Sequence, residues 1–179
     1  MAVLTRIETP VGTIIASSDG QSLTGLWFEG QKYECAFVEN PVWDDSLPLW
    51  KNVKTALKDY FQGESDVVST VPIAFVGGTS FQKAVWDVLT EIHYQTVWTY
   101  KEVAERVGEK QGLKTSSRAV GTAIGRNPIS LFVSCHRVVA TTGALTGYAG
   151  GVDRKRALLA FEGHRITKDK VSKGERHEA

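Results

Sequence analysis

Two kinds of hydrophobic periodicity divide this chain, and the change between them constrains the fold more than any other feature. Residues 5–30 alternate short β-rich stretches with turn signals at Pro10-Val11-Gly12 and Ser18-Asp19-Gly20, a pattern typical of a meander of short strands. Residues 47–63 then repeat apolar side chains on one helical face and stop at Gly63. The sequence therefore predicts a small N-terminal α/β unit, which carries no obvious chemistry and which we interpret as a scaffold.

Helical patterns dominate from residue 80 onward. An apolar stripe follows Ser80, and residues 99–108 then begin with a T-x-x-E capping box and end at Gly108. After a loop, residues 115–127 show Ser/Thr caps and a second apolar stripe. Two short helices joined by a turn indicate a helix-turn-helix, although generic helix pairs are common and this loop is longer than the usual turn. The predicted fold class is α/β, with a mainly helical, winged-helix-like C-terminal domain.

Charge separates the same two parts of the chain. Residues 1–80 carry 5 Lys/Arg against 10 Asp/Glu, whereas residues 81–165 carry 12 against 7. This asymmetry favours contact between the second half and a polyanion; the alternative is chance variation between two solvated surfaces. We place the domains at residues 1–79 and 80–165, and we predict a disordered tail over 166–179, which is polar and lacks an apolar stripe.

Composition excludes several classes of protein. The 179 residues include 2 Cys and 4 scattered His, too few for a disulfide framework and not at zinc spacing, so we expect no metal and no cofactor. No apolar run reaches the roughly 18 residues that cross a bilayer, and the N-terminus lacks the pattern of a signal peptide. We therefore expect a cytoplasmic protein, a monomer, with no membrane partner.

The second helix of the predicted pair is unusually rich in small residues. It opens with Ser116 and Ser117, and Arg118 is its one long cation. Small side chains let a backbone approach another molecule closely, and the N-terminal end of a helix favours phosphate. This helix suits insertion into a DNA groove, with Arg118 in place of a displaced base. The alternative is a surface arginine on a tightly packed helix.

The stretch VSCHRVV places Cys135 directly before His136. A free thiol has a pKa of about 8.5, so only a few per cent is thiolate at neutral pH, and a nearby base would raise that share. Adjacent residues of an extended strand point to opposite faces. The two side chains therefore cooperate only if the backbone turns there or if water relays the proton. On residue type alone, a buried inert cysteine is the better interpretation.

A set of motifs reverses that interpretation. Arg-Ala-Val-Gly, Gly-Arg-Asn-Pro, Cys-His-Arg-Val, Gly-Tyr-x-Gly-Gly and Leu-Leu-x-x-Glu-Gly occur in this order within residues 118–164. This segment resembles the O6-alkylguanine-DNA alkyltransferases, also called methylated-DNA–protein-cysteine methyltransferases, and the likeness extends upstream to residue 80. Over residues 1–75 only the size and the strand-helix pattern are similar, which implies a ribonuclease H-like N-terminal domain.

The resemblance implies direct reversal of DNA damage. The partner would be double-stranded DNA carrying O6-alkylguanine, with O4-alkylthymine as a second candidate lesion. The damaged base would be flipped out of the duplex, and Cys135 would take its alkyl group irreversibly. Each molecule would act once.

The resemblance also assigns roles to matching positions. Cys135 would be the nucleophile, His136 would accept its proton through a water, and Glu162 would polarise the imidazole. Asn127 would tie the recognition helix to the active-site segment by backbone hydrogen bonds. As alternatives, Asn127 is only a turn residue and Glu162 only a surface charge.

The remaining implied contacts are with DNA and with the flipped base. Tyr100 would donate a hydrogen bond to the guanine and press on a phosphate, and Arg118 would fill the vacated stack in the minor groove. The full set implied to bind DNA is Tyr100, Ser116, Ser117, Arg118 and Thr141. The base pocket would be formed by Val138, Tyr148 and Ala149, of which Tyr148 is alternatively a core residue.

One departure from the family concerns the residue before the nucleophile. Ser134, and also Ser130, occupy positions where relatives usually have proline. Proline fixes φ and removes an N–H donor, so we expect a less rigid approach to Cys135 and one more polar group in the pocket wall. Our hypothesis is that transfer still occurs, with an altered rate or alkyl-group preference.

Three other functions are alternatives to alkyl transfer. Alkyltransferase-like proteins bind lesions without repairing them, but they have another residue in place of the cysteine. A sequence-specific regulator needs base-reading side chains, and the second helix offers one arginine. A Cys-His hydrolase needs an oxyanion pocket, which the sequence does not reveal.

Overall fold

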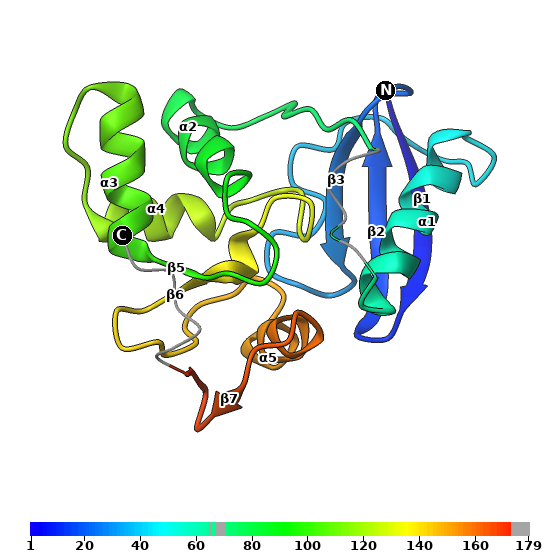
Figure 1. Ribbon diagram of the computed structural model, residues 1–179. Coiled ribbons are helices and arrows are strands. Elements are labelled where there is room, and N and C mark those ends of the chain that lie inside the picture. The colour runs from blue at the N-terminus through cyan, green and yellow to red at the C-terminus, as the bar shows by residue number, and fades with distance from the viewer. Residues whose placement is uncertain (65, 67–70, 173–179) are drawn as a thin grey trace. The chain divides into compact units, whose positions relative to one another are not determined.

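The computed structural model describes residues 1–64, 66 and 71–172, which form two compact units (Figure 1). Unit 1 comprises Met1–Gly78 and Pro128–Phe132. Unit 2 comprises Thr79–Asn127 and the described chain from Val133 onward. Within the described residues, no helix is both long and apolar enough to cross a membrane.

The sheet of unit 1 begins as the predicted meander. Strands β1 (Ala2–Thr9), β2 (Gly12–Ser18) and β3 (Leu23–Phe28) pair antiparallel in sequence. A short strand that the sequence did not indicate, β4 (Pro41–Trp43), runs parallel to β1, which gives the order β3-β2-β1-β4. The predicted strand meander is confirmed, and β4 completes the sheet at its far edge.

One helix closes the core of unit 1. Helix α1 (Leu49–Phe61) packs against β1 with its apolar face, and Gly63 follows it with φ of 75°, a left-handed conformation that suits glycine. Trp27 and Trp50 are both almost fully buried. The predicted helix is therefore confirmed, with burial of its apolar stripe as the reason for its position.

The free edge of β3 is covered by two separate peptides of unit 1. Leu23 exchanges backbone hydrogen bonds with residues 72 and 74, at 2.8 and 3.0 Å. Leu26 does the same with residues 128 and 130, also at 2.8 and 3.0 Å. Pairing of this kind satisfies backbone groups that an exposed edge would leave to solvent or to another chain.

Three helices of unit 2 pack on one another: α2 (Ser80–Leu89), α3 (Tyr100–Gln111) and α4 (Ser117–Ile124). The buried indole of Trp86 in α2 donates a hydrogen bond of 2.8 Å to the carbonyl of Ala123 in α4. The capping box predicted at the start of α3 is present, formed by Thr99 and Glu102. Helices α3 and α4 are the predicted helix-turn-helix pair.

Helix α3 continues past Gly108, where the sequence placed its end. It stops at Gly112, which has φ of 70° and whose N–H bonds to the carbonyl of Gly108. Gly108 serves packing instead, because a Cβ there would lie 2.6 Å from the carbonyl oxygen of Leu113. The prediction was wrong because a helical glycine can be required by a close approach as well as by a C-cap.

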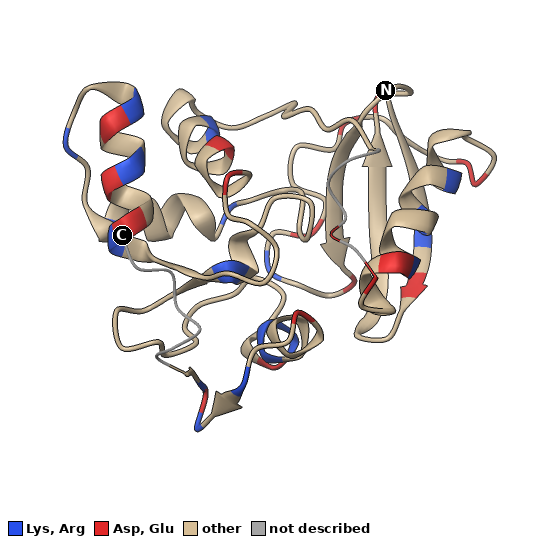
Figure 2. Cartoon of the chain, in the orientation of Figure 1, with Lys and Arg blue, Asp and Glu red and all other residues tan. Residues whose placement is uncertain are grey.

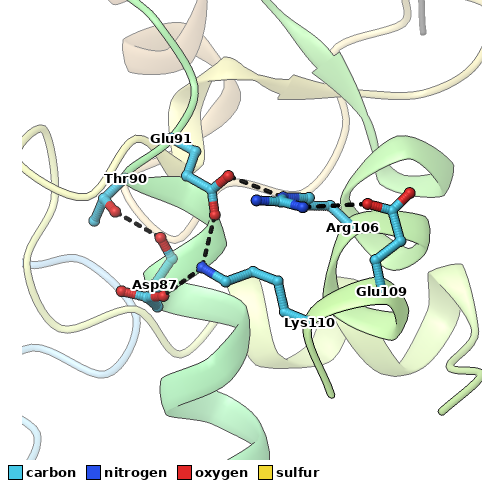
Figure 3. A network of polar contacts seen from close by, with 6 residues as sticks. All are labelled: Asp87, Thr90, Glu91, Arg106, Glu109 and Lys110. Carbon is cyan, nitrogen blue, oxygen red and sulfur yellow. Dashed lines mark hydrogen bonds and ion pairs between the residues drawn. The ribbon is translucent and has the colours of Figure 1, made fainter. Parts of the chain in front are cut away.

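Exposed charges also join α2 to α3 (Figure 3). Lys110 of α3 contacts Asp87 and Glu91 at 2.9 Å, and Arg106 contacts Glu91 at 2.9 Å and Glu109 at 3.2 Å. These side chains remain partly solvated, so each pair adds little to stability. Acidic and basic residues alternate along α3 (Figure 2).

The rest of the described part of unit 2 consists of short strands, a 3₁₀ turn and a further helix. Strands β5 (Trp98–Thr99) and β6 (Val138–Val139) pair in parallel, a 3₁₀ turn η1 (Cys135–Arg137) precedes β6, and α5 (Val152–Phe161) packs against η1.

The predicted disordered tail is wrong for its first part. Strands β7 (Ile166–Thr167) and β8 (Lys170–Val171) form a hairpin, and the fully buried side chain of Val171 contributes to an apolar cluster with Leu145 and Leu159. Val171 and the partly buried Ile166 anchor this segment, and two apolar residues are too weak a pattern to recognise in the sequence. The remainder of the predicted tail, residues 173–179, lies outside the described residues.

Candidate active site

The backbone turns at the Cys-His pair. Cys135, His136 and Arg137 form the 3₁₀ turn η1, in which the N–H of Arg137 bonds to the carbonyl of Ser134 at 3.0 Å. The N–H of Cys135 bonds back to the carbonyl of Val133 at 2.8 Å. The backbone turn that direct cooperation between these neighbouring side chains would require is therefore present.

The thiol of Cys135 is buried and hydrogen-bonded. Nδ2 of Asn127 donates to Sγ at 3.1 Å and to the carbonyl oxygen of Val133 at 3.0 Å, so one amide holds both the sulfur and the turn before it. Burial raises the pKa of the Cys135 thiol above its ordinary value, while the Asn127 hydrogen bond and the charge of Lys155 oppose that rise. The resting group is a thiol that needs a base to become a nucleophile.

A buried carboxylate holds the neighbouring imidazole. Oε2 of Glu162 lies 2.6 Å from Nε2 of His136, and both side chains have no exposed surface. Burial alone would raise the pKa of Glu162, but His136 and Arg137 more than offset that effect and keep it well below its usual range. A carboxylate that accepts from Nε2–H fixes the tautomer whose basic lone pair is on Nδ1.

A guanidinium joins this pair to the turn. Nε of Arg137 donates to Oε1 of Glu162 at 2.8 Å, and Nη1 donates to the carbonyl of Ile92 and to Oγ of Ser134, both at 2.9 Å. Arg137 is fully buried, and such a charge is stable only when it is paired and hydrogen-bonded. Sequence analysis did not assign it a role.

Lys155 of α5 is a second buried cation that sequence analysis missed. Its Nζ donates to the carbonyl of Thr146 at 2.9 Å and lies 5.9 Å from the ring centre of Tyr100. Burial lowers the pKa of Lys155 from 10.5 to about 8, and the Cys135 thiolate acts in the opposite direction. The positive charge of Lys155 and the negative charge of a Cys135 thiolate therefore stabilise each other.

A sequence signal for Lys155 exists. Within the run Arg154-Lys155-Arg156, Lys155 lies three and four residues before Leu158 and Leu159, so both leucines are on its helical face. Glu162 follows three residues later on the same face. Charged residues at core positions of an amphipathic helix are a better indication of a site than a run of basic residues, which usually marks a solvated surface.

The residues expected to contact DNA lie mainly on α4. Ser116 is its N-cap, with Oγ accepting from the N–H of Ala119 at 3.0 Å, and Ser117 and Arg118 are exposed beside it. Thr141 is also exposed, in the loop after β6. The structure therefore leaves the small-residue end of α4 and its arginine open to solvent.

The residues expected around the flipped base differ in burial. The hydroxyl of Tyr100 donates to the carbonyl of Thr146 at 3.3 Å, and burial raises the pKa of this tyrosine, so it stays a phenol. Tyr148 and Ala149 are half-buried in the loop before α5, whereas Val138 is fully buried in β6. In the described part of the chain, no three His, Cys, Asp or Glu side chains are grouped to hold a metal.

Comparison with known proteins identifies the family. The DNA-binding domain of 6-O-methylguanine DNA methyltransferases matches residues 80–164, and the ribonuclease-like domain of the same proteins matches residues 3–75. The chain belongs to this family. Methylated-DNA–protein-cysteine methyltransferases are similar throughout: that of Haemophilus influenzae is 40% identical over 88% of this chain and 84% of its own. That of Shigella flexneri is 46% identical over 89% and 94%.

Solved structures of family members share the fold. The O6-methylguanine methyltransferase of Mycobacterium tuberculosis is 36% identical, with a TM-score of 0.79 over 94% of this chain and 97% of that one. A structure of Mycobacterium tuberculosis OGT in complex with DNA gives the same TM-score at 35% identity, over 89% and 92%. The predicted α/β fold class and the resemblance seen in the sequence are both confirmed.

Proposed function

We propose that this protein repairs DNA by transferring the alkyl group of O6-alkylguanine irreversibly to its own Cys135. The observation that carries the proposal is the buried Cys135 thiol, held by Asn127 beside a His136–Glu162 pair, within a chain that belongs to the methyltransferase family. A nucleophile, a base and a group that orients the base are the parts that thiol chemistry requires.

The reaction needs no cofactor. Sγ of Cys135 attacks the alkyl carbon, a carbon–sulfur bond forms as the carbon–O6 bond breaks, and the bonding electron pair stays on the guanine. The thiol proton passes to Nδ1 of His136 through a water, and Glu162 stabilises the imidazolium that results. Because a thioether does not return its alkyl group, one molecule performs one transfer.

The leaving guanine needs a donor, since it would otherwise depart as a poorly stabilised anion. We assign this role to Tyr100, which remains a phenol because burial raises its pKa. Lys155 lies near the same ring and shares the Thr146 carbonyl with it. The cation would favour negative charge that develops on the sulfur and on the base.

DNA would be bound through α4. Its exposed end presents Ser116, Ser117 and Arg118, and small side chains there permit close contact with a groove while Arg118 fills the place of the flipped base. Thr141 would add a contact with the backbone. Val138, Tyr148 and Ala149 would wall the pocket that receives the base, whose extrusion costs a few kcal/mol and is cheapest for a badly paired lesion.

Stoichiometric transfer tests the function. Excess duplex with a labelled O6-methylguanine should place one methyl group on each wild-type molecule and none on Cys135→Ala. Cys35→Ala is the matched control, because Cys35 is the other free cysteine and lies in unit 1; it should keep full transfer. A folded wild-type protein that takes up no label would overturn the proposal.

We further propose that the protein works as a monomer in the cytoplasm, because the residues assigned to transfer all come from one chain. Size-exclusion chromatography with light scattering, before and after methyl transfer, should give the mass of a single chain in both states. A stable dimer would contradict this part of the proposal.

A further inference from the structure

Ser134 is held by the same guanidinium that holds the catalytic carboxylate. Its side chain is almost fully buried, and its Oγ accepts a hydrogen bond of 2.9 Å from Nη1 of Arg137. Nε of Arg137 contacts Glu162, which contacts His136. One rigid, planar cation thus links the residue before the nucleophile to the group that orients the base.

The backbone of Ser134 already has the shape that a proline would impose. Its φ of −81° and ψ of 52°, with the hydrogen bond from the N–H of Cys135 to the carbonyl of Val133, define an inverse γ-turn. This φ lies close to the range that a pyrrolidine ring permits. Ser134 therefore has a backbone conformation that proline could also adopt, and its side chain is hydrogen-bonded to Arg137.

We propose that Ser134 is a positioning residue for alkyl transfer, and that its hydrogen bond to Arg137 fixes the turn that presents Cys135 beside His136. We call this hydrogen bond the Ser134–Arg137 clamp. The inference rests on the proposed function and adds to it a residue that substitutes a side-chain hydrogen bond for the rigidity of a ring.

The clamp acts across the turn. The Ser134 carbonyl accepts from the Arg137 N–H at 3.0 Å while its hydroxyl accepts from the Arg137 side chain, so the residue before the turn is joined twice to the last residue of the turn. Arg137 keeps its bonds to Glu162 and to the Ile92 carbonyl when the hydroxyl is removed. Loss of the hydroxyl should therefore make the turn less rigid, so that the distance between the thiol and the imidazole varies more. The position of the guanidinium should change less.

Three variants test the clamp. Ser134→Ala removes the hydroxyl, Ser134→Pro removes it but fixes φ, and Ser130→Ala is the matched control, since it deletes another buried serine hydroxyl from unit 1. Each is measured by thermal unfolding, by the single-turnover rate of methyl transfer, and by the pH profile of iodoacetamide alkylation. Peptide mass separates Cys135 from Cys35 in the last measurement.

We expect Ser134→Ala to transfer about tenfold more slowly, because small misplacements of reacting groups are costly, and its pH midpoint for alkylation of Cys135 to move upward. Ser134→Pro should recover most of the rate and the wild-type midpoint, and Ser130→Ala should match wild type in both.

Two outcomes would overturn the clamp: Ser134→Ala equal to wild type in rate and midpoint, or a folded Ser134→Pro as slow as Ser134→Ala. Should Ser134→Pro fail to fold, the comparison of Ser134→Ala with Ser130→Ala decides by itself. If wild type does not accept a methyl group from DNA, the proposed function fails, whereas the iodoacetamide series still tests whether the clamp positions the thiol.

Discussion

Units 1 and 2 bury different kinds of polar side chain. Among the described residues, those that unit 1 buries are neutral: Thr5, Ser17, Ser18, Thr24, Gln31 and Ser130. Those that unit 2 buries include ionisable groups, namely His136, Arg137, Lys155, Glu162 and His164. Removing a charge from water costs several kcal/mol even after relaxation of the surroundings. Unit 2 therefore has a desolvation cost on folding that unit 1 does not have.

The location of these charges gives the reason. Glu162 is paired with both Arg137 and His136, and the charge of Lys155 opposes the rise in the pKa of Cys135. Buried groups with perturbed pKa values gather where chemistry requires them. Among the described residues, the unit that contains Cys135 therefore buries a carboxylate, two cations and two imidazoles, and unit 1 buries no Asp, Glu, Lys, Arg or His.

The largest effect should come from Glu162→Gln. It leaves Arg137 and His136 without their buried counter-charge, so we expect methyl transfer to fall roughly 100-fold and the free energy of unfolding to fall by about 3 kcal/mol. The control is Glu29→Gln in unit 1, which breaks the exposed Arg6–Glu29 pair and should cost less than about 1 kcal/mol. If the two variants lost the same free energy of unfolding in urea, the proposed difference between the units would be contradicted.

The same variant should change the response to acid. Because the folded pKa of Glu162 lies below its ordinary value of 4.5, its stabilising contribution is complete above that value and is lost as the pH falls toward the folded pKa. The free energy of unfolding of Glu162→Gln should therefore decline less steeply than that of wild type between about pH 5 and pH 2. Parallel curves would contradict this assignment.

Lys155→Met should separate stability from activity. The pKa of Lys155 falls from 10.5 to about 8 on folding, so the unfolded chain binds more protons between these values and the stability of wild type rises with pH there. The variant should lose this rise, which amounts to up to about 3 kcal/mol, and be more stable than wild type at neutral pH. Urea unfolding at pH 7 and at pH 10 measures both effects.

The reactivity of Cys135 in Lys155→Met should fall, although the stability of this variant rises. Without the cation the pKa of Cys135 rises further, and alkylation of Cys135 at pH 7 should slow on the order of tenfold. Lys83→Met, which removes an exposed lysine of α2, should change neither property. A variant that is more stable and equally reactive would show that Lys155 has no electrostatic role at the sulfur.

The smallest effect should come from the exposed charges between α2 and α3 (Figure 3). Lys110→Ala removes two ion pairs whose side chains remain partly solvated, so we expect a cost below about 1 kcal/mol and unchanged methyl transfer. Thermal unfolding at low and at high salt measures this cost. If Lys110→Ala lost as much free energy of unfolding as Glu162→Gln, the proposed difference between buried and exposed charges would be contradicted.

Hydrophobic periodicity and helix-capping residues predicted most of the fold from the sequence. The meander, α1, and the capping box of Thr99 and Glu102 follow from local patterns, and these are confirmed. Strand β4 and the β7–β8 hairpin did not follow, because they depend on pairing and burial that only the folded chain creates. Gly108 was misassigned for the same reason, since its role is a contact with Leu113.

The candidate site was predictable in part. Motifs located Cys135, His136, Asn127 and Glu162, which the structure places in two hydrogen-bonded pairs, Asn127–Cys135 and His136–Glu162. Arg137 belongs to the Cys-His-Arg-Val motif, but the sequence did not indicate a role for it. A sequence alone does not show when an arginine, a residue usually found on the surface, is buried. The expectation for Ser134 considered the backbone alone and did not include the hydrogen bond that its side chain accepts from Arg137.

The most direct measurement is the location of the transferred methyl group. Wild-type protein is incubated with excess duplex that carries O6-methylguanine, digested, and examined by peptide mass for the two cysteines, one in each unit. We expect one methyl group on the Cys135 peptide, none on the Cys35 peptide, and no further uptake with time. An unmodified Cys135 in a folded protein, or equal modification of both cysteines, would contradict the account.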